Sequence, residues 1–157
     1  MSAKARFMKK LQEQQPRSRT FDSKSQADIA EFCTRMSQLQ EAMTGWLIDT
    51  GISTEEMPVS VLDAFAGSRS FTVPGIALRY ENRMVKFTPV FLYGQGVTGG
   101  VEVTLCGEGH ITPLNRLFMR SGDEVNWSYS AYGSSAATIK LFSEDAFFDM
   151  IGRLLPD

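Results

Sequence analysis

The chain contains few residues that could carry out acid–base, redox or metal chemistry. Its 157 residues include a single histidine, His110, and two cysteines, Cys33 and Cys106. Two cysteines do not form a disulfide framework, so we expect reduced thiols. The chain also lacks the paired C-x-x-C or H-x-x-x-H spacing of a structural zinc site. We therefore predict neither a metal site nor a cofactor.

Long apolar runs are missing as well. No segment approaches the roughly 18 apolar residues of a membrane-spanning helix, which argues against insertion into a membrane. The N-terminus lacks the apolar stretch and the small-residue cleavage site of a secretory signal. Hydrophobic residues make up 43% of the chain and charged residues 22%, which is typical of a folded globular domain. These features predict a cytoplasmic protein that buries a core without disulfides.

Positive charge is concentrated at the N-terminus. Residues 1–24 carry seven bases against two acids, a net charge of +5, whereas residues 25–157 carry nine bases against sixteen acids, a net charge of −7. We interpret residues 1–24 as a basic, flexible arm, with a short helix before Pro16 and a linker after it, and residues 25–157 as a single domain. The arm could bind phosphates, act as an organelle presequence, fold back onto the domain or stay solvated.

An apolar stripe predicts a helix over residues 25–49. Ser25 and Asp28 resemble a capping box, and the apolar residues then follow at alternating spacings of three and four: Ile29, Phe32, Met36, Leu39, Met43 and Trp46. The stripe covers barely three heptads and lacks the charged flanking pairs that select a coiled-coil partner. We expect it to pack on the protein's own sheet, with a dimer or a partner helix as the alternative.

The rest of the chain predicts an α+β fold. The segment from Ser53 to Gly67 combines a capping-box pattern, an early proline and a terminal glycine, which predicts a short helix. Residues 70–142 have a period of two broken by short turns, typical of an antiparallel meander of about five or six strands. A last helix is predicted from the N-cap Ser143. The N-terminal helices and this C-terminal helix would pack on the sheet.

Six glycines lie close to His110 in "YGQGVTGGVEVTLCGEGH", residues 93–110. A triphosphate-binding loop would need a Gly-Lys-[Ser/Thr] sequence, which this segment lacks. A dinucleotide fingerprint would have to open a helix, but the alternation of Val101, Val103 and Leu105 predicts a strand. We therefore predict that the glycines serve turns, with a ligand-contacting loop as the alternative.

Two groups of residues are candidates for a functional site. Cys106 and His110 could form a thiol–imidazole pair for nucleophilic catalysis, but they flank a turn that leaves their relative direction open. Trp127, Tyr129 and Tyr132 alternate with small residues, which suits a recognition surface or a sheet face covered by a helix.

The sparse chemistry favours a non-catalytic protein-interaction domain of the adaptor, chaperone or immunity-protein kind, with another protein or a second copy as its partner. The contact residues would be Trp127, Tyr129, Tyr132, Lys4, Arg6, Lys9, Lys10, Arg17 and Arg19. One alternative is a nucleic-acid-associated protein that binds through residues 1–24. Another is a small hydrolase or transferase that uses Cys106 or His110.

Overall fold

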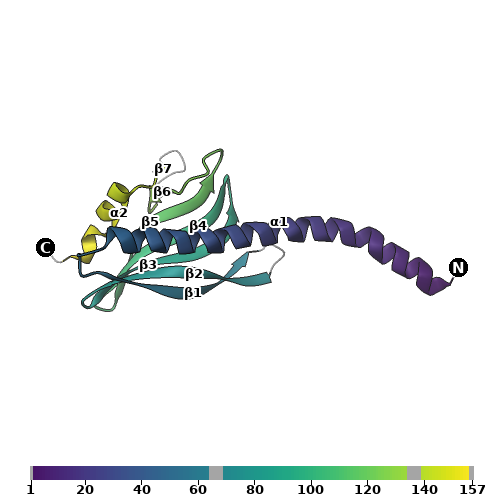
Figure 1. Ribbon diagram of the computed structural model, residues 1–157, viewed down its shortest axis with the longest axis horizontal. Coiled ribbons are helices and arrows are strands. Elements are labelled where there is room, and N and C mark those ends of the chain that lie inside the picture. Colours follow the sequence, from purple (N-terminus) through teal and green to yellow (C-terminus); the bar gives the residue numbers. More distant parts are fainter. Residues whose placement is uncertain (1, 64–68, 134–138, 156–157) are drawn as a thin grey trace.

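The computed structural model describes residues 2–63, 69–133 and 139–155, with side chains described for residues 2–9, 24–62, 70–133 and 139–155. A long helix is followed by seven strands, a short helix and a 3-10 turn (Figure 1). The elements are α1 (Ala3–Trp46), β1 (Ser53–Asp63), β2 (Arg69–Tyr80), β3 (Arg83–Gly94), β4 (Val97–Gly107), β5 (His110–Ser121), β6 (Ser128–Ala131), β7 (Lys140–Leu141), α2 (Glu144–Ile151) and η3 (Gly152–Leu154).

The strands form one sheet whose spatial order follows the chain from β1 to β7, and all neighbouring strands are antiparallel. The predicted α+β meander is therefore confirmed, with seven strands in place of five or six. None of the helices in the described part of the chain is long and apolar enough to cross a membrane.

The extra strand is β1, where the sequence predicted a helix, and that prediction was wrong. Val59 is half-buried and Val61 is buried, whereas Pro58 and Ser60, which alternate with them, are exposed, so burial follows a period of two. β1 is an edge strand, where a proline without an N–H group does not interrupt the sheet. The capping-box pattern did not determine the secondary structure of this segment, because hydrogen-bonded pairing along β2 outweighs a local helix start. Residues 64–67 of the predicted helix lie outside the described residues.

α1 is a single helix of 44 residues. The backbone is helical where the sequence predicted a linker after Pro16, and the two predicted N-terminal helices are one element. A proline inside a helix removes one backbone hydrogen bond, but the surrounding Gln, Glu, Lys and Arg residues have high helix propensity. At the start of α1, the side chain of Ser2 accepts a hydrogen bond from the Ala5 N–H at 3.2 Å.

The C-terminal half of α1 lies across one face of the sheet (Figure 1). Its stripe residues Phe32, Met36, Leu39 and Met43 are buried in one core cluster with side chains from strands β1 to β5. The prediction that the stripe packs on the protein's own sheet is confirmed, and this surface is not available to a partner helix. Burying side chains of this size contributes about 1.5–3 kcal/mol each before entropy is counted.

α2 closes the end of the core. Its predicted N-cap is present, because the Ser143 side chain accepts a hydrogen bond from the Ala146 N–H at 3.2 Å. Phe147 is fully buried, and its ring centroid lies 5.1 Å from that of Trp46 at the end of the stripe. The short helix therefore holds the last turn of α1 against the sheet.

The glycine-rich segment forms two hairpin turns with β4 between them. Gly96 and Gly109 have φ angles of 73° and 79° and lie at these turns, as the sequence predicted. Gly99 has a different role inside β4. Its φ is 74°, and a Cβ built on it would lie 2.7 Å from the Met119 Cβ and 3.3 Å from the Phe32 ring. A side chain at position 99 would therefore push against the packing of α1 on the sheet.

Candidate interaction surface

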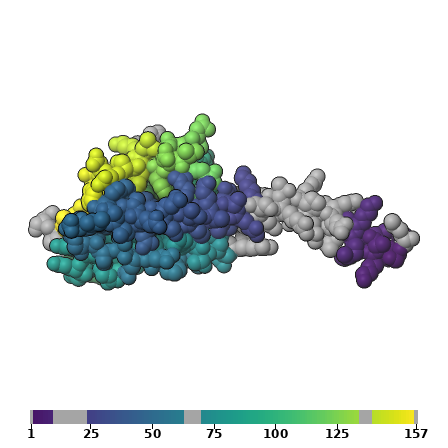
Figure 2. Space-filling model, in the orientation of Figure 1, coloured from purple at the N-terminus to yellow at the C-terminus, as the bar shows by residue number. Residues whose placement is uncertain are grey.

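The N-terminal part of α1 extends away from the sheet (Figure 1). Figure 2 shows its described tip, residues 2–9, standing apart from the body of the molecule. Every described side chain of the tip is exposed, including Phe7 at 65% and Met8 at 46%. At about 1.5 Å per residue, the helix from Ala3 to Lys24 is about 33 Å long. The tip thus presents apolar side chains on a free helix.

Bases surround these apolar side chains. Lys4, Arg6 and Lys9 are exposed on the tip, and Lys24 is exposed where the helix reaches the body. The side chains of Lys10, Arg17 and Arg19, which the sequence also predicted as contacts, lie outside the described ones. Over residues 1–24 the net charge is +5, so the extension creates a positive field that attracts acidic partners.

A polar cluster fixes the helix where it leaves the body. Arg120 of β5 forms two ion pairs with α1. Its Nη2 lies 2.7 Å from Oδ1 of Asp28, and its Nε lies 3.0 Å from Oε2 of Glu31. The Tyr93 hydroxyl of β3 donates a hydrogen bond to the second Asp28 oxygen. Ser25, which is buried, also hydrogen-bonds to Tyr93. Two strands thus hold about two turns of α1, from Ser25 to Glu31, which sets the direction of the extension.

The surroundings of Tyr93 affect its protonation. Burial, followed by the hydrogen bond to the Asp28 carboxylate, raises the pKa of Tyr93 to about 12. The phenol therefore stays neutral at physiological pH and remains a donor to Asp28. The sequence had assigned Asp28 to a helix cap, and it did not identify Arg120 or Tyr93. No local pattern could have done so, because these partners lie 92 and 65 residues along the chain.

The three predicted aromatic contact residues do not share one surface. Trp127 and Tyr129 are half-buried against the core cluster. The Arg35 guanidinium lies 5.3 Å from the Trp127 ring centroid and donates a hydrogen bond to the Met119 carbonyl at 2.9 Å. Tyr132 is 56% exposed and lines a separate pocket. For Trp127 and Tyr129 the structure matches the alternative of a covered sheet face.

Cys106 and His110 are not brought together. In the β4–β5 ladder Cys106 is opposite Ile111, whereas His110 is opposite Gly107. Directly opposed residues share a face and successive residues alternate, so Cys106 and His110 lie on opposite faces of the hairpin. No hydrogen bond joins the two side chains among the described contacts. The geometry does not assemble the thiol–imidazole pair of a nucleophilic enzyme.

The other cysteine is also engaged in the fold. The Cys33 thiol donates a weak hydrogen bond to the Thr72 carbonyl at 3.4 Å, and burial raises the pKa of this thiol. A raised pKa disfavours the thiolate, which is the reactive form. Within the described ranges, no three His, Cys, Asp or Glu side chains lie close enough together to hold a metal ion.

A second surface lies between α1 and the β6–β7 end of the sheet. It is a pocket of about 390 Å³ whose apolar wall includes Leu39, Trp46, Trp127 and Phe142. Trp46 and Phe142 of this wall form an aromatic cluster with Phe147, with ring centroids 5.1 to 6.5 Å apart. Aromatic contacts at these distances stabilise the end of the fold, so this wall has a structural role of its own.

Comparisons with protein-family models, with curated proteins and with solved structures found no match.

Proposed function

We propose that the protein is a non-catalytic interaction protein that presents the N-terminal extension of α1 to another protein chain. The observation that carries this proposal is the contrast along α1. The stripe from Phe32 to Met43 is covered by the protein's own sheet, whereas Phe7 and Met8 on the same helix are exposed.

An exposed helix tip of this kind suits insertion into a groove. Amphipathic helices bind proteins by placing a few apolar anchors in a groove while charged residues contact its rim. Phe7 and Met8 would supply the anchors, and Lys4, Arg6 and Lys9 would contact an acidic rim. Each anchor contributes about 1.5–3 kcal/mol when it is fully buried.

The polar cluster at Asp28 supports a presenting role. The ion pairs with Arg120 and the hydrogen bond from Tyr93 hold α1 at the point where it leaves the sheet. A binding element with a fixed direction loses less conformational freedom on association than a disordered peptide does.

Photo-crosslinking tests this proposal. A benzophenone amino acid at Phe7 should capture a specific protein in the host cell, whereas the same group at Ile111, an apolar residue that is 72% exposed on the body, should not. The captured protein, once purified, should bind the full chain, and Phe7→Glu/Met8→Glu should weaken binding by at least about tenfold, equal to about 1.4 kcal/mol. Equal capture at both positions, or unchanged affinity of the double variant, would reject the proposal.

Nucleic acid is the second candidate partner, and the net charge of +5 over residues 1–24 favours it. Binding through phosphates would be independent of sequence and would fall steeply with salt, with a slope of about −0.9 per phosphate contacted on duplex DNA. Fluorescence anisotropy with a labelled duplex should then show binding at low salt that Lys4→Glu/Lys9→Glu abolishes. No binding at low salt, or binding that this variant leaves intact, would exclude this candidate.

A further inference from the structure

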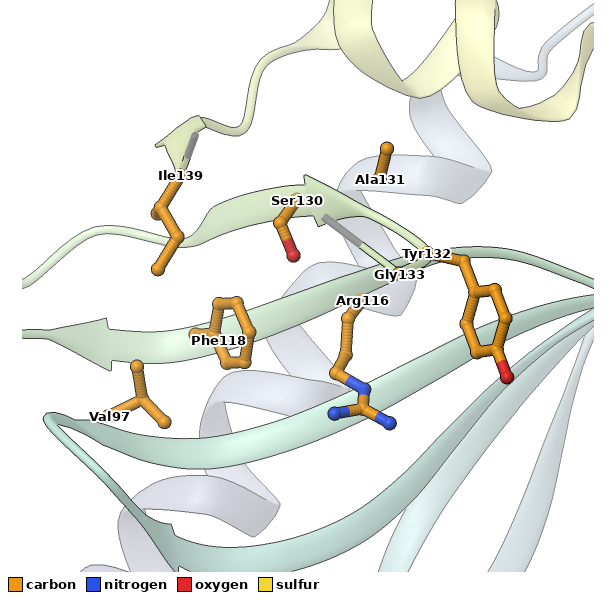
Figure 3. Close-up of a pocket in the computed structure, with 8 residues that line it drawn as sticks. All are labelled: Val97, Arg116, Phe118, Ser130, Ala131, Tyr132, Gly133 and Ile139. Atoms are coloured by element: carbon orange, nitrogen blue, oxygen red, sulfur yellow. The ribbon is translucent and has the colours of Figure 1, made fainter. Parts of the chain in front are cut away.

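A pocket lies on the sheet face opposite α1, beside β5 and β6 (Figure 3). Leu117 and Met119 of β5 belong to the core under α1. Arg116 and Phe118 alternate with them and therefore point to the other face. The pocket has a volume of about 430 Å³, within the range of about 300–1,000 Å³ that is typical of sites for small organic ligands.

Arg116 supplies the charge of this pocket. Of its eight described lining residues, only Arg116 is charged. The nearest acidic residue in the ladder is Glu102, which is opposite Arg116 on β4. Glu102 and Arg116 are not among the ion pairs found in the described residues. A guanidinium offers several N–H donors in a planar fork that matches a carboxylate.

Buried hydroxyl groups lie next to Arg116. Ser130 is opposite Arg116 on β6, is only 8% exposed and lines the pocket (Figure 3). Ser128 is opposite Phe118 on the same face, is 2% exposed, and its Oγ makes no hydrogen bond among the described residues. Ser128 is not among the described lining residues, so Ser130 is the hydroxyl that a ligand beside Arg116 can reach.

The opposite side of the pocket is apolar. Phe118 forms its wall together with Val97 and Ile139 (Figure 3). Arg116 and Phe118 are two residues apart on one strand, so their side chains start about 7 Å apart. A ligand that contacts both must therefore carry its negative charge at one end and an apolar chain several carbons long at the other.

We propose that this pocket binds a small organic carboxylate with an apolar tail. The carboxylate accepts hydrogen bonds from Arg116 and from the Ser130 hydroxyl, and the tail lies along Phe118. The site is on the opposite face of the sheet from α1, so it does not depend on the function proposed for the helix extension.

Titration of the full chain with sodium octanoate, followed by amide NMR shifts, tests this proposal. We expect saturable shifts centred on Phe118, Ser130 and Tyr132. Arg116→Gln should raise the octanoate Kd by at least about tenfold, because it removes the charge-assisted hydrogen bonds to the carboxylate. Lys86→Gln, which removes the same charge from β3, is the matched control and should change the Kd by less than about twofold.

Two further probes separate the contributions of charge and tail. Acetate should bind much more weakly than octanoate, because it lacks the tail that contacts Phe118. 1-Octanol should bind weakly, with an affinity that Arg116→Gln leaves unchanged. The proposal is overturned if octanoate causes no saturable shift at these residues, if Arg116→Gln and Lys86→Gln have equal effects, or if acetate binds as well as octanoate.

Discussion

The two halves of α1 have the same secondary structure but opposite surroundings. From Phe32 to Met43 an apolar residue faces the sheet at each turn and is buried. Along residues 2–9 the side chains are exposed and three of them are basic. The change occurs at Ser25 and Asp28, where polar contacts to β3 and β5 replace apolar packing. One helix is therefore a core element at one end and an exposed element at the other.

The largest expected difference in stability comes from removing one phenylalanine side chain from each half of α1. Phe32→Ala leaves a cavity under α1 and should lower the free energy of unfolding by about 3–5 kcal/mol. Phe7→Ala removes an exposed ring and should change it by no more than about 0.5 kcal/mol. Urea denaturation of both variants measures this difference, and similar losses at the two positions would contradict the assignment of the tip as unpacked.

A glycine pair tests how closely the buried half approaches the sheet. Gly99→Ala combines a positive φ with contact against Met119 and Phe32, and should destabilise the fold by about 2–4 kcal/mol. Gly96→Ala has a similar φ but open space around its Cβ, so about 1–2 kcal/mol is expected. Thermal and urea unfolding should separate the two variants. Equal losses would mean that backbone strain alone acts at position 99.

The junction between the halves should have an intermediate effect. Arg120→Gln leaves the largely covered Asp28 carboxylate without its ion pair, and should lower stability by about 1–3 kcal/mol. Arg79→Gln breaks the exposed pair with Glu55 and is the control, with an expected loss of no more than about 1 kcal/mol. A spin label at position 8 should also become more mobile relative to the body in Arg120→Gln only, as measured by electron paramagnetic resonance.

The smallest expected effect is a pH dependence at Tyr93. Its pKa in the folded protein is raised to about 12, above the value of about 10 in an unfolded chain. The unfolded state therefore loses its proton first, and the stabilisation from neutral Tyr93 is complete below about pH 10 and is lost as pH rises towards 12. Tyr93→Phe should remove this part of the decline when unfolding is measured from pH 9 to 12. An identical decline in both proteins would show that Tyr93 does not contribute.

Three features that depend only on neighbours along the chain were predicted correctly. The stripe spacing identified the buried face of α1, Ser143 identified the start of α2, and the glycines identified the turns at Gly96 and Gly109. Each of these features depends on residues within a few positions of one another, so their local geometry is already encoded in the spacing.

Features that depend on distant partners were not predicted. β1 was interpreted as a helix, because its capping-box pattern is local whereas its strand state depends on pairing with β2. The exact surroundings of Asp28 depend on Arg120, and those of Arg116 depend on Ser130 across the ladder. The separation of Cys106 from His110 likewise follows from the register of β4 against β5.

The sequence alone determined that the chain carries a basic N-terminal segment, an apolar helical stripe and a run of short antiparallel strands. Composition and residue spacing are enough for this, because each of these features depends on residues that are close together in the sequence. Only the tertiary structure decided that the apolar stripe and the basic segment belong to one helix. It also decided that the sheet covers the stripe, that the tip of the basic segment is exposed, and that Arg116 faces a pocket. The physical reason is that burial depends on which surfaces meet, and chain spacing does not specify contacts between residues that are far apart in sequence.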